Sequence, residues 1–304
     1  DREYFFGGID VSWNRIKGGG SIEKMAKKID RNFDHEQPVE SLPELLKLYQ
    51  MIDQLQDGYW KKVKQADLKG IIEQVAGLFL EAAAGDYSAT PGSMVELTME
   101  VINRSSADVQ LIQATYLPAD VDTILKLKLN DNESNKFYHQ LAISENISLT
   151  NPYWLNEKGT YGTYKVASQP LIGLPETPHQ MAVRFDLIIE GKPISIEKPV
   201  VYKNTDRVKG EVYRPFEITA PVYANIVDDV YVFDEVKTKT VSVVVKAMTD
   251  NLEGAVTLAH PEGWQIEPAS IPISMKRKGA EEIIAFQLTP PEGQAEGLIS
   301  PIIS

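Results

Sequence analysis

The sequence predicts an α+β fold in several domains, with a helical segment first and two antiparallel β-sandwich domains after it. Two observations carry this prediction. Near Gly85 the spacing of apolar residues changes from about 3.6 to about 2, which is the change from amphipathic helices to strands. Further on, residues 203–210 are polar and lack alternation, as a linker would. We therefore expect a helical region over residues 1–84, a first sandwich over 85–206 and a second over 207–304.

The helical region is expected to hold three amphipathic helices. Ser21 can cap the first, and residues 41–44 read Ser-Leu-Pro-Glu, the form of a capping box that opens the second. The third carries apolar residues at helical spacing from Leu68 to Ala82, and Gly85 stands where a C-terminal glycine belongs. These helices either form a small bundle or lie against a neighbouring domain.

Strands are expected wherever apolar and polar residues alternate, because such a strand has one buried and one wet face. Turns rich in Gly, Pro and Asn separate them, which is typical of sandwiches of the immunoglobulin or fibronectin-III type. The expected strands are 95–101, 125–129 and 181–189 in the first domain, and 230–233, 241–245, 255–258, 271–275, 283–288 and 297–304 in the second.

Composition excludes several classes of function. The chain of 304 residues has a net charge of −12, from 31 Lys and Arg against 43 Asp and Glu. An acidic surface repels phosphate backbones, so nucleic acid is not an expected partner. There is no Cys, which removes thiolate metal sites and a Cys nucleophile. No window reaches the roughly 18 apolar residues of a membrane span. The chain starts without Met or a signal peptide, and we expect it to be a piece of a longer protein.

A zinc site is the sharpest catalytic hypothesis. Ala259-His260-Pro261-Glu262 resembles the opening of the zinc site in a family of sugar deacetylases, but such a site needs three protein ligands. His35 stands between Asp34 and Glu36, and neighbours in sequence point in different directions; His139 and His179 stand alone. No two-His or three-His spacing occurs. We predict no metal ligands and no catalytic residues in this chain.

Two phrases carry a resemblance to a known family. Residues 4–19 read Y-F-F-G-G-I-D-V-S-W-N-R-I-K-G-G, and residues 151–155 read N-P-Y-W-L. Both resemble the region that follows the catalytic domain in Bacteroidetes-type members of the LmbE-like (PIG-L) family of N-acetylglucosaminyl deacetylases. The resemblance covers nearly the whole chain. It implies an accessory region of a zinc-dependent deacetylase of N-acetylglucosamine-type sugars, in a bacterial periplasm or outside the cell.

The family's zinc-binding His-Pro-Asp-Asp box has no match here. The resemblance therefore places zinc only in a catalytic domain upstream of this chain, and it implies no cofactor within these residues. It also makes that upstream domain the first expected partner. Asp10, Ser12, Trp13 and Arg15 are the candidate contacts with it, because so polar a phrase beside glycines is unusual for plain packing.

The last part of the chain resembles the NPCBM-associated NEW3 sandwich domain, which occurs beside catalytic modules of carbohydrate-active enzymes. The resemblance rests on a strand that leads into Pro261-Glu262-Gly263-Trp264 and on the later Pro268 and Gly279. It implies that Trp264 plugs the core, that His260 is a turn residue, and that the domain is truncated at its C-terminus.

A glycan is the second expected partner. Its candidate site is an aromatic patch whose rings suit the apolar faces of sugars, with amides for the hydroxyls: Tyr153, Trp154, Tyr161 and Tyr164, with Asn151 and Asn156. The alternative is that these aromatics pack the end of the sandwich. Two other functions stay open, a stand-alone hydrolase using Asp10, Asp34 or His35, and a purely structural spacer.

Overall fold

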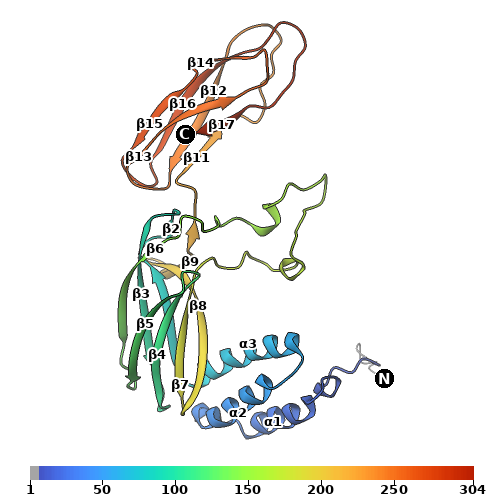
Figure 1. Cartoon of the computed structure of the whole chain (residues 1–304), viewed down its shortest axis with the longest axis vertical. Helices are drawn as coiled ribbons and strands as arrows, with labels where there is room; N and C mark the ends of the chain where they lie inside the picture. Colours follow the sequence, from blue (N-terminus) through green and yellow to red (C-terminus); the bar gives the residue numbers. More distant parts are fainter. Residues whose placement is uncertain (1–6) are drawn as a thin grey trace. The chain divides into compact units, whose positions relative to one another are not determined.

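The structure is a computed structural model that describes residues 7–304 (Figure 1). The described chain divides into two compact units, each assembled from separate stretches. The first unit contains the described part of Asp1–Gly85, with Glu96–His139 and Met181–Tyr213; the second contains Asp86–Val95, Gln140–Gln180 and Arg214–Ser304. The fold is mostly β with a helical N-terminus, as predicted. None of the helices in residues 7–304 has the length and apolar character that crossing a bilayer requires.

The helices of the first unit pack through apolar stripes. Fully buried Ile22, Leu42 and Ile72 mark the packed faces of the three longer helices, and an ion pair of 2.5 Å joins Glu73 of the third to Lys198 of the neighbouring sheet. The elements are η1 (Trp13–Arg15), α1 (Gly19–Asn32), η2 (Pro38–Ser41), α2 (Leu42–Asp53) and α3 (Gly58–Val75).

The predicted serine caps are wrong. Gly18, in the left-handed region at φ 88°, precedes α1, and the Ser21 hydroxyl inside that helix donates to the Gly18 carbonyl at 3.0 Å. Ser41 is helical itself and donates to the Pro38 carbonyl at 2.7 Å, so no capping box forms. In each case the hydroxyl bonds a carbonyl of the preceding turn rather than a free N–H. Asp57 caps α3, accepting from the Trp60 N–H at 3.0 Å.

The predicted extension of the third helix to Ala82 is also wrong. α3 ends at Val75, Gly77 turns the chain at φ 60°, and β1 (Leu78–Ala84) follows as a strand buried along most of its length. A short apolar run bounded by a turn glycine fits a buried strand as well as a helix, and periodicity alone does not separate them.

The sheet of the first unit has the strand order β5-β4-β7-β8-β1-β3-β6, with β9 paired to β8. Its long strand β8 changes partner along its length. Residues 192–199 pair antiparallel with β7, and residues 200–202 pair parallel with β1, so β8 links two layers of strands. The strands are β3 (Met94–Asn103), β4 (Val109–Leu117), β5 (Val121–Leu129), β6 (Asn135–Ala142), β7 (Ala182–Ile189), β8 (Lys192–Asp206) and β9 (Gly210–Pro215).

The polar stretch 203–210 is a hairpin and not a linker, which corrects its interpretation as a boundary. β8 runs on to Asp206, whose carboxylate accepts from the N–H groups of Val208 and Lys209 at 2.8 Å, and β9 begins at Gly210. An Asx-type turn uses polar residues, so a polar composition marks a turn as readily as a linker. The division into residues 1–84, 85–206 and 207–304 otherwise stays a prediction.

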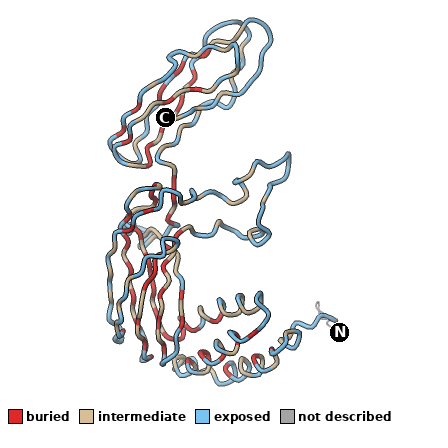
Figure 2. Tube along the Cα trace, in the orientation of Figure 1, coloured by how far each residue is buried: buried red, intermediate tan, exposed pale blue. Residues whose placement is uncertain are grey.

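In the second unit the core lies between the sheets β11-β12-β16-β14 and β15-β13-β17, and Figure 2 shows the buried positions recurring along these strands. The alternation at 241–245, 255–258, 271–275 and 283–288 is confirmed. Residues 230–233, predicted as a strand, form an irregular segment, and the strand before it was not predicted. The strands are β2 (Ser88–Ala89), β10 (Glu217–Ile218), β11 (Val222–Ile226), β12 (Lys239–Ala247), β13 (Leu252–Ala259), β14 (Gln265–Glu267), β15 (Ile271–Met275), β16 (Glu281–Thr289) and β17 (Ser300–Ile303).

Candidate functional site

The predicted aromatic patch lies in a long irregular connection between β6 and β7, residues 143–181 (Figure 1). This fully described stretch contains the short 3-10 turns η3 (Tyr153–Leu155) and η4 (Gln169–Leu171), but no strand and no α-helix. Connections longer than about 12–15 residues without regular structure are uncommon in compact domains and are usually functional or linkers. We name this connection the excursion.

The two limbs of the excursion are tied together at Tyr153. Its N–H donates to the Thr177 hydroxyl at 3.0 Å, and that hydroxyl donates to the Asn151 carbonyl at 3.0 Å. The Tyr153 hydroxyl donates to the Leu174 carbonyl at 3.0 Å, and the Trp154 ring meets the Tyr153 ring edge-on at 4.9 Å. Both rings are half-buried. They therefore hold the base of the excursion in shape.

Tyr161 and Tyr164 lie in a separate turn. The backbone N–H groups of Thr160 and Thr163 each donate to the other residue's carbonyl, at 3.1 and 3.2 Å, and Gly162 between them has φ 82°. Tyr161 is fully exposed and Tyr164 is 70% exposed. The candidate ligand Asn151 and its neighbour Asn156 are exposed as well. The structure thus separates the predicted patch into two pairs. Tyr153 and Trp154 support the loop, whereas the rings of Tyr161 and Tyr164 are exposed to solvent.

The N-terminal phrase forms a compact turn of its own; its first residues, Tyr4 to Phe6, lie outside the described residues. The Asp10 carboxylate accepts from the Ser12 hydroxyl at 2.7 Å and from the Ser12 N–H at 2.9 Å, while the Ser12 hydroxyl accepts from the Asn14 N–H at 3.2 Å. The hydroxyl bond first, and then the N–H bond, lowers the pKa of Asp10. Asp10 therefore serves a local turn while remaining exposed.

The Arg15 end of that phrase packs against α3. The Arg15 guanidinium lies over the Trp60 ring at 5.8 Å from its centroid, and Lys64 approaches the same ring at 6.0 Å. A cavity of about 80 Å³ lies between the phrase and these α3 side chains. A Cβ at Gly19 would collide with the Trp13 carbonyl, so glycine is required there. Close packing thus explains Gly19, and a left-handed backbone at φ 88° explains Gly18, while the Arg15 side chain stays exposed.

Three of the four histidines have local contacts of their own. His260 is exposed, and its Nδ1 lies 3.0 Å from the Pro261 carbonyl. His35 meets Phe33 edge-on at 5.1 Å, and His139 stacks on Tyr116 at 4.5 Å. Within residues 7–304, no group of three or more His, Cys, Asp or Glu side chains is arranged to hold a metal ion.

A buried ionic network in the first unit was not predicted. Glu81 is only 9% exposed; its carboxylate accepts from Lys203 at 2.6 Å and from the Tyr213 hydroxyl at 2.8 Å. Burial first, and then the Glu81 carboxylate, raises the pKa of Tyr213 to about 12. The Glu81 bond raises the pKa of Lys203. The signal in the sequence was a single charged residue inside the apolar run of residues 78–84.

No family model matches this sequence, and no curated protein matches it. Among solved structures, it is similar to the native conformation of Escherichia coli alpha-2-macroglobulin at 11% identity and a TM-score of 0.25, covering 75% of this chain and 15% of that one. A red sea bream transglutaminase is 12% identical at a TM-score of 0.31, with coverage of 82% and 31%. The Bacillus subtilis sporulation control protein Spo0M is 10% identical at 0.22, with coverage of 70% and 90%.

The chain thus spans less than a third of the alpha-2-macroglobulin and of the transglutaminase. At these TM-scores, no inference about the function of this chain follows from the likenesses.

Proposed function

We propose that this chain is an accessory region in which two immunoglobulin-like sandwiches carry a carbohydrate-binding excursion. The strand orders support the sandwich type. In the first unit β1-β3-β6 and β5-β4-β7-β8 follow the order in which immunoglobulin strands divide between two layers, with the last strand beside the first. In the second unit β11-β12-β16-β14 and β15-β13-β17 divide in a related way.

The enzyme that this region serves is, in our proposal, a zinc-dependent LmbE-like deacetylase of N-acetylglucosamine-type sugars, in a bacterial periplasm or outside the cell. The support is the sequence phrase around Asp10 to Arg15. Asp10 and Arg15 are both exposed, and Arg15 lines a small cavity, so both side chains are open to contact with an upstream domain.

The observation that carries the carbohydrate-binding proposal is the display of Tyr161 and Tyr164. A fully exposed tyrosine ring such as that of Tyr161 contributes no hydrophobic burial to the stability of the fold. The turn that carries it is held in shape by paired backbone hydrogen bonds. Such a ring offers a sugar an apolar face and a hydroxyl at its edge. Because the backbone of this turn is already held in place, binding a ligand need not order the turn itself.

The test compares exposed tyrosines, and the control matches Tyr164 in exposure. Tyr161→Ala and Tyr164→Ala should each weaken retention on a chitin oligosaccharide column about fivefold, from the loss of roughly 1 kcal/mol of ring contact. Tyr138→Ala is the control, because Tyr138 is 69% exposed on β6. Circular dichroism melts of these variants should overlay. If no glycan retains the wild-type protein, the carbohydrate-binding proposal is wrong and the spacer function is favoured.

The second candidate function is a hydrolase that uses Asp10, Asp34 or His35. Its test is metal analysis of the purified chain with a deacetylase assay on an N-acetylglucosamine derivative. The accessory proposal expects less than stoichiometric zinc and no turnover for this chain. It expects stoichiometric zinc and turnover for the protein encoded by the full reading frame. Turnover by these 304 residues, abolished by Asp34→Asn, would support the hydrolase instead.

A further inference from the structure

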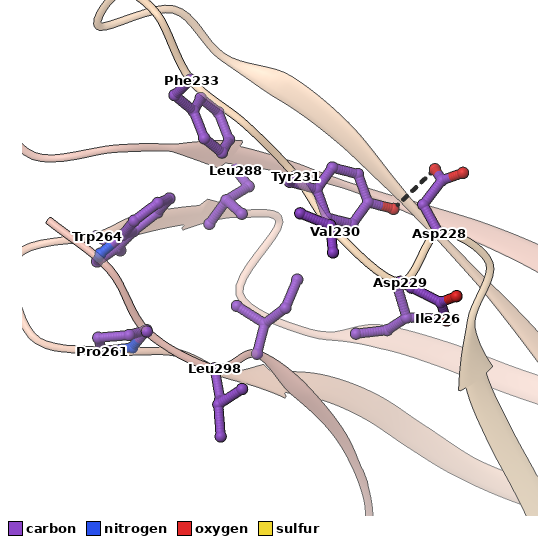
Figure 3. A pocket seen from close by; sticks show the side chains of 12 residues that line it. Ile226, Asp228, Asp229, Val230, Tyr231, Phe233, Pro261, Trp264, Leu288 and Leu298 are labelled. Carbon is purple, nitrogen blue, oxygen red and sulfur yellow. Dashed lines mark hydrogen bonds between the residues drawn. The ribbon is translucent and has the colours of Figure 1, made fainter.

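Cavities of ligand size lie in both units. In the second unit, a cavity of about 420 Å³ lies beside Trp264, whose ring meets the Phe233 ring edge-on at 5.3 Å (Figure 3). Both rings, together with Tyr231, pack against the core of the last sandwich, and the Tyr231 hydroxyl donates to the Asp228 carboxylate at 3.1 Å. The packing of that core therefore explains this cavity, whereas the cavity of the first unit needs another explanation.

The cavity of the first unit lies between α3 and β8 and measures about 580 Å³, within the roughly 300–1,000 Å³ of ordinary ligand pockets. We name it the α3 groove. Residues spaced by four lie along one face of a helix, and on this face α3 presents Gly58, Ala66 and Gly70. A Cβ added to either glycine would meet open space. The groove is therefore open because these positions of α3 carry almost no side-chain volume.

Two of the five charged side chains that line the α3 groove are neutralised by neighbouring residues. The Lys61 ammonium lies 2.9 Å from the Asp53 carboxylate, which also accepts from the Gln65 amide at 3.0 Å. The Glu73 carboxylate lies 2.5 Å from the Lys198 ammonium. These pairs hold the walls of the groove and leave no net charge for a ligand.

The other three charged side chains are Lys62, Lys69 and Glu197, and none of them has a side-chain partner among residues 7–304. Lys62 and Lys69 are two helical turns apart, about 10 Å along the axis of α3, so their long side chains can reach one point above Ala66. Glu197 is exposed on the β8 side of the groove. In a chain with a net charge of −12, these two ammonium groups thus remain available to an anion.

This set of groups fits a ligand that carries a carboxylate and hydroxyl groups together. Ammonium groups donate strong, charge-assisted hydrogen bonds to a carboxylate. The Glu197 carboxylate only accepts, so it requires a donor such as a hydroxyl group. A simple anion would meet repulsion at Glu197, and a cationic ligand would meet repulsion at Lys62 and Lys69. The volume of the groove is that of a small-molecule site.

We propose that the α3 groove binds a sugar acid, whose carboxylate lies between Lys62 and Lys69 and whose hydroxyl groups donate to Glu197. The groove shares no residue with the excursion. Loss of sugar-acid binding and loss of chitin retention are therefore separate results, and Lys69→Gln should leave retention on the chitin oligosaccharide column unchanged.

The first test titrates the whole chain with methyl glucuronide and with methyl glucoside, which differ only in a carboxylate against a hydroxymethyl group. We expect the glucuronide to shift the NMR signals of the Lys69 and Gly70 amides in a saturable way. It should bind at least about tenfold more tightly than the glucoside, because only the glucuronide offers the lysines a charge. Equal binding of the two sugars, or no shift with the glucuronide at high millimolar concentration, overturns the proposal.

The second test compares variants of the helices. Lys62→Gln and Lys69→Gln should each weaken glucuronide binding about fivefold and reduce its salt dependence. Lys47→Gln is the matched control, because Lys47 is exposed on α2 outside the groove lining. Ala66→Leu should abolish binding without lowering the melting temperature, since leucine fills the groove and favours a helix. Full binding by Ala66→Leu, or equal losses in Lys47→Gln and Lys69→Gln, would contradict the assigned site.

Two other ligand classes are distinguishable outcomes. Inorganic phosphate and a short peptide of alternating glutamate and glycine should both bind more weakly than the glucuronide, because neither offers Glu197 a hydroxyl group. Glu197→Gln should weaken glucuronide binding and strengthen phosphate binding, since it removes both a charged acceptor and a repulsive charge. Phosphate that binds as tightly as the glucuronide would make the groove an unselective anion site. A peptide that binds more tightly would make it a docking site for an acidic protein segment, and either result overturns the sugar-acid proposal.

Discussion

At the scale of single residues, the most informative side chain is Glu81. A carboxylate buried in a strand is costly unless it is paired and hydrogen-bonded, and here both conditions are met by Lys203 and Tyr213. The pairing joins β1, β8 and the β8–β9 hairpin within the first unit. It therefore explains why a charged residue is tolerated inside an otherwise apolar strand.

We predict a stability effect at Tyr213 that depends on pH. Tyr213→Phe should lower the free energy of unfolding by about 1 kcal/mol at pH 7, the usual contribution of one such hydrogen bond. The folded-state pKa of about 12 lies above the ordinary value of 10, so this contribution is complete below pH 10 and is lost as pH rises toward 12. The gap between wild type and variant should therefore close over that range in urea unfolding experiments.

The control for this prediction is Tyr223→Phe. Tyr223 is 40% exposed against 47% for Tyr213, and its hydroxyl should matter by less than about 0.5 kcal/mol. A gap that stays constant from pH 7 to 12 would mean that the Tyr213 hydroxyl is not a donor to Glu81.

At the scale of elements, the end of α3 decides where the helical region stops. Gly77 holds φ 60°, and a Cβ there would lie 3.1 Å from the Arg104 backbone carbon. The Arg104 N–H in turn donates to the Gly77 carbonyl at 2.8 Å. This glycine thus ends the helix and brings the start of β1 beside the end of β3, where Leu78 pairs with Asn103.

A pair of glycine substitutions tests this account. Gly77→Ala should destabilise the protein by at least about 1 kcal/mol, because the backbone conformation is strained for alanine and a tight contact is added. Gly70→Ala should stabilise it by about 0.5–1 kcal/mol, since Gly70 is inside α3 with open space around it. Chemical denaturation of both variants gives the two signs, and equal signs would contradict the role assigned to Gly77.

Secondary structure was predictable where one face of an element is buried and the other is exposed to solvent. The alternation over 241–245 and 283–288 gave strands in the expected places, because burial enforces a period of two. Residues 78–84 were misread because a strand buried on both sides loses its period. Residues 230–233 are a continuous apolar run that does not pair as a strand, and two of their side chains, Val230 and Val232, are exposed.

At the scale of the whole molecule, the predicted domains are contiguous ranges of the sequence, whereas each compact unit of the structure is assembled from separate stretches of the chain. The hairpin at residues 207–209 and the excursion at 143–181 show why. Both are polar or irregular in composition, and composition alone cannot tell a turn within a unit from a connection between units.

The candidate sites were likewise predictable in residue type but not in three-dimensional arrangement. The residue types of the excursion predicted an aromatic patch, but only the hydrogen bonds of Tyr153 separate the rings that support the loop from those that it displays. The Glu81 network could not be derived from the sequence, because it joins residues far apart in the chain, Glu81 and Tyr213.

The sequence by itself determined a mostly β fold with a helical N-terminus, the acidic charge, the lack of cysteine and the position of most of the strands that were predicted from it, because these depend on composition and on local periodicity. The tertiary structure decided which side chains meet and which stay exposed, as the partners of Glu81 and the exposure of Tyr161 illustrate. Contacts between distant residues follow from how sheets pair and layer, and no local pattern encodes that pairing.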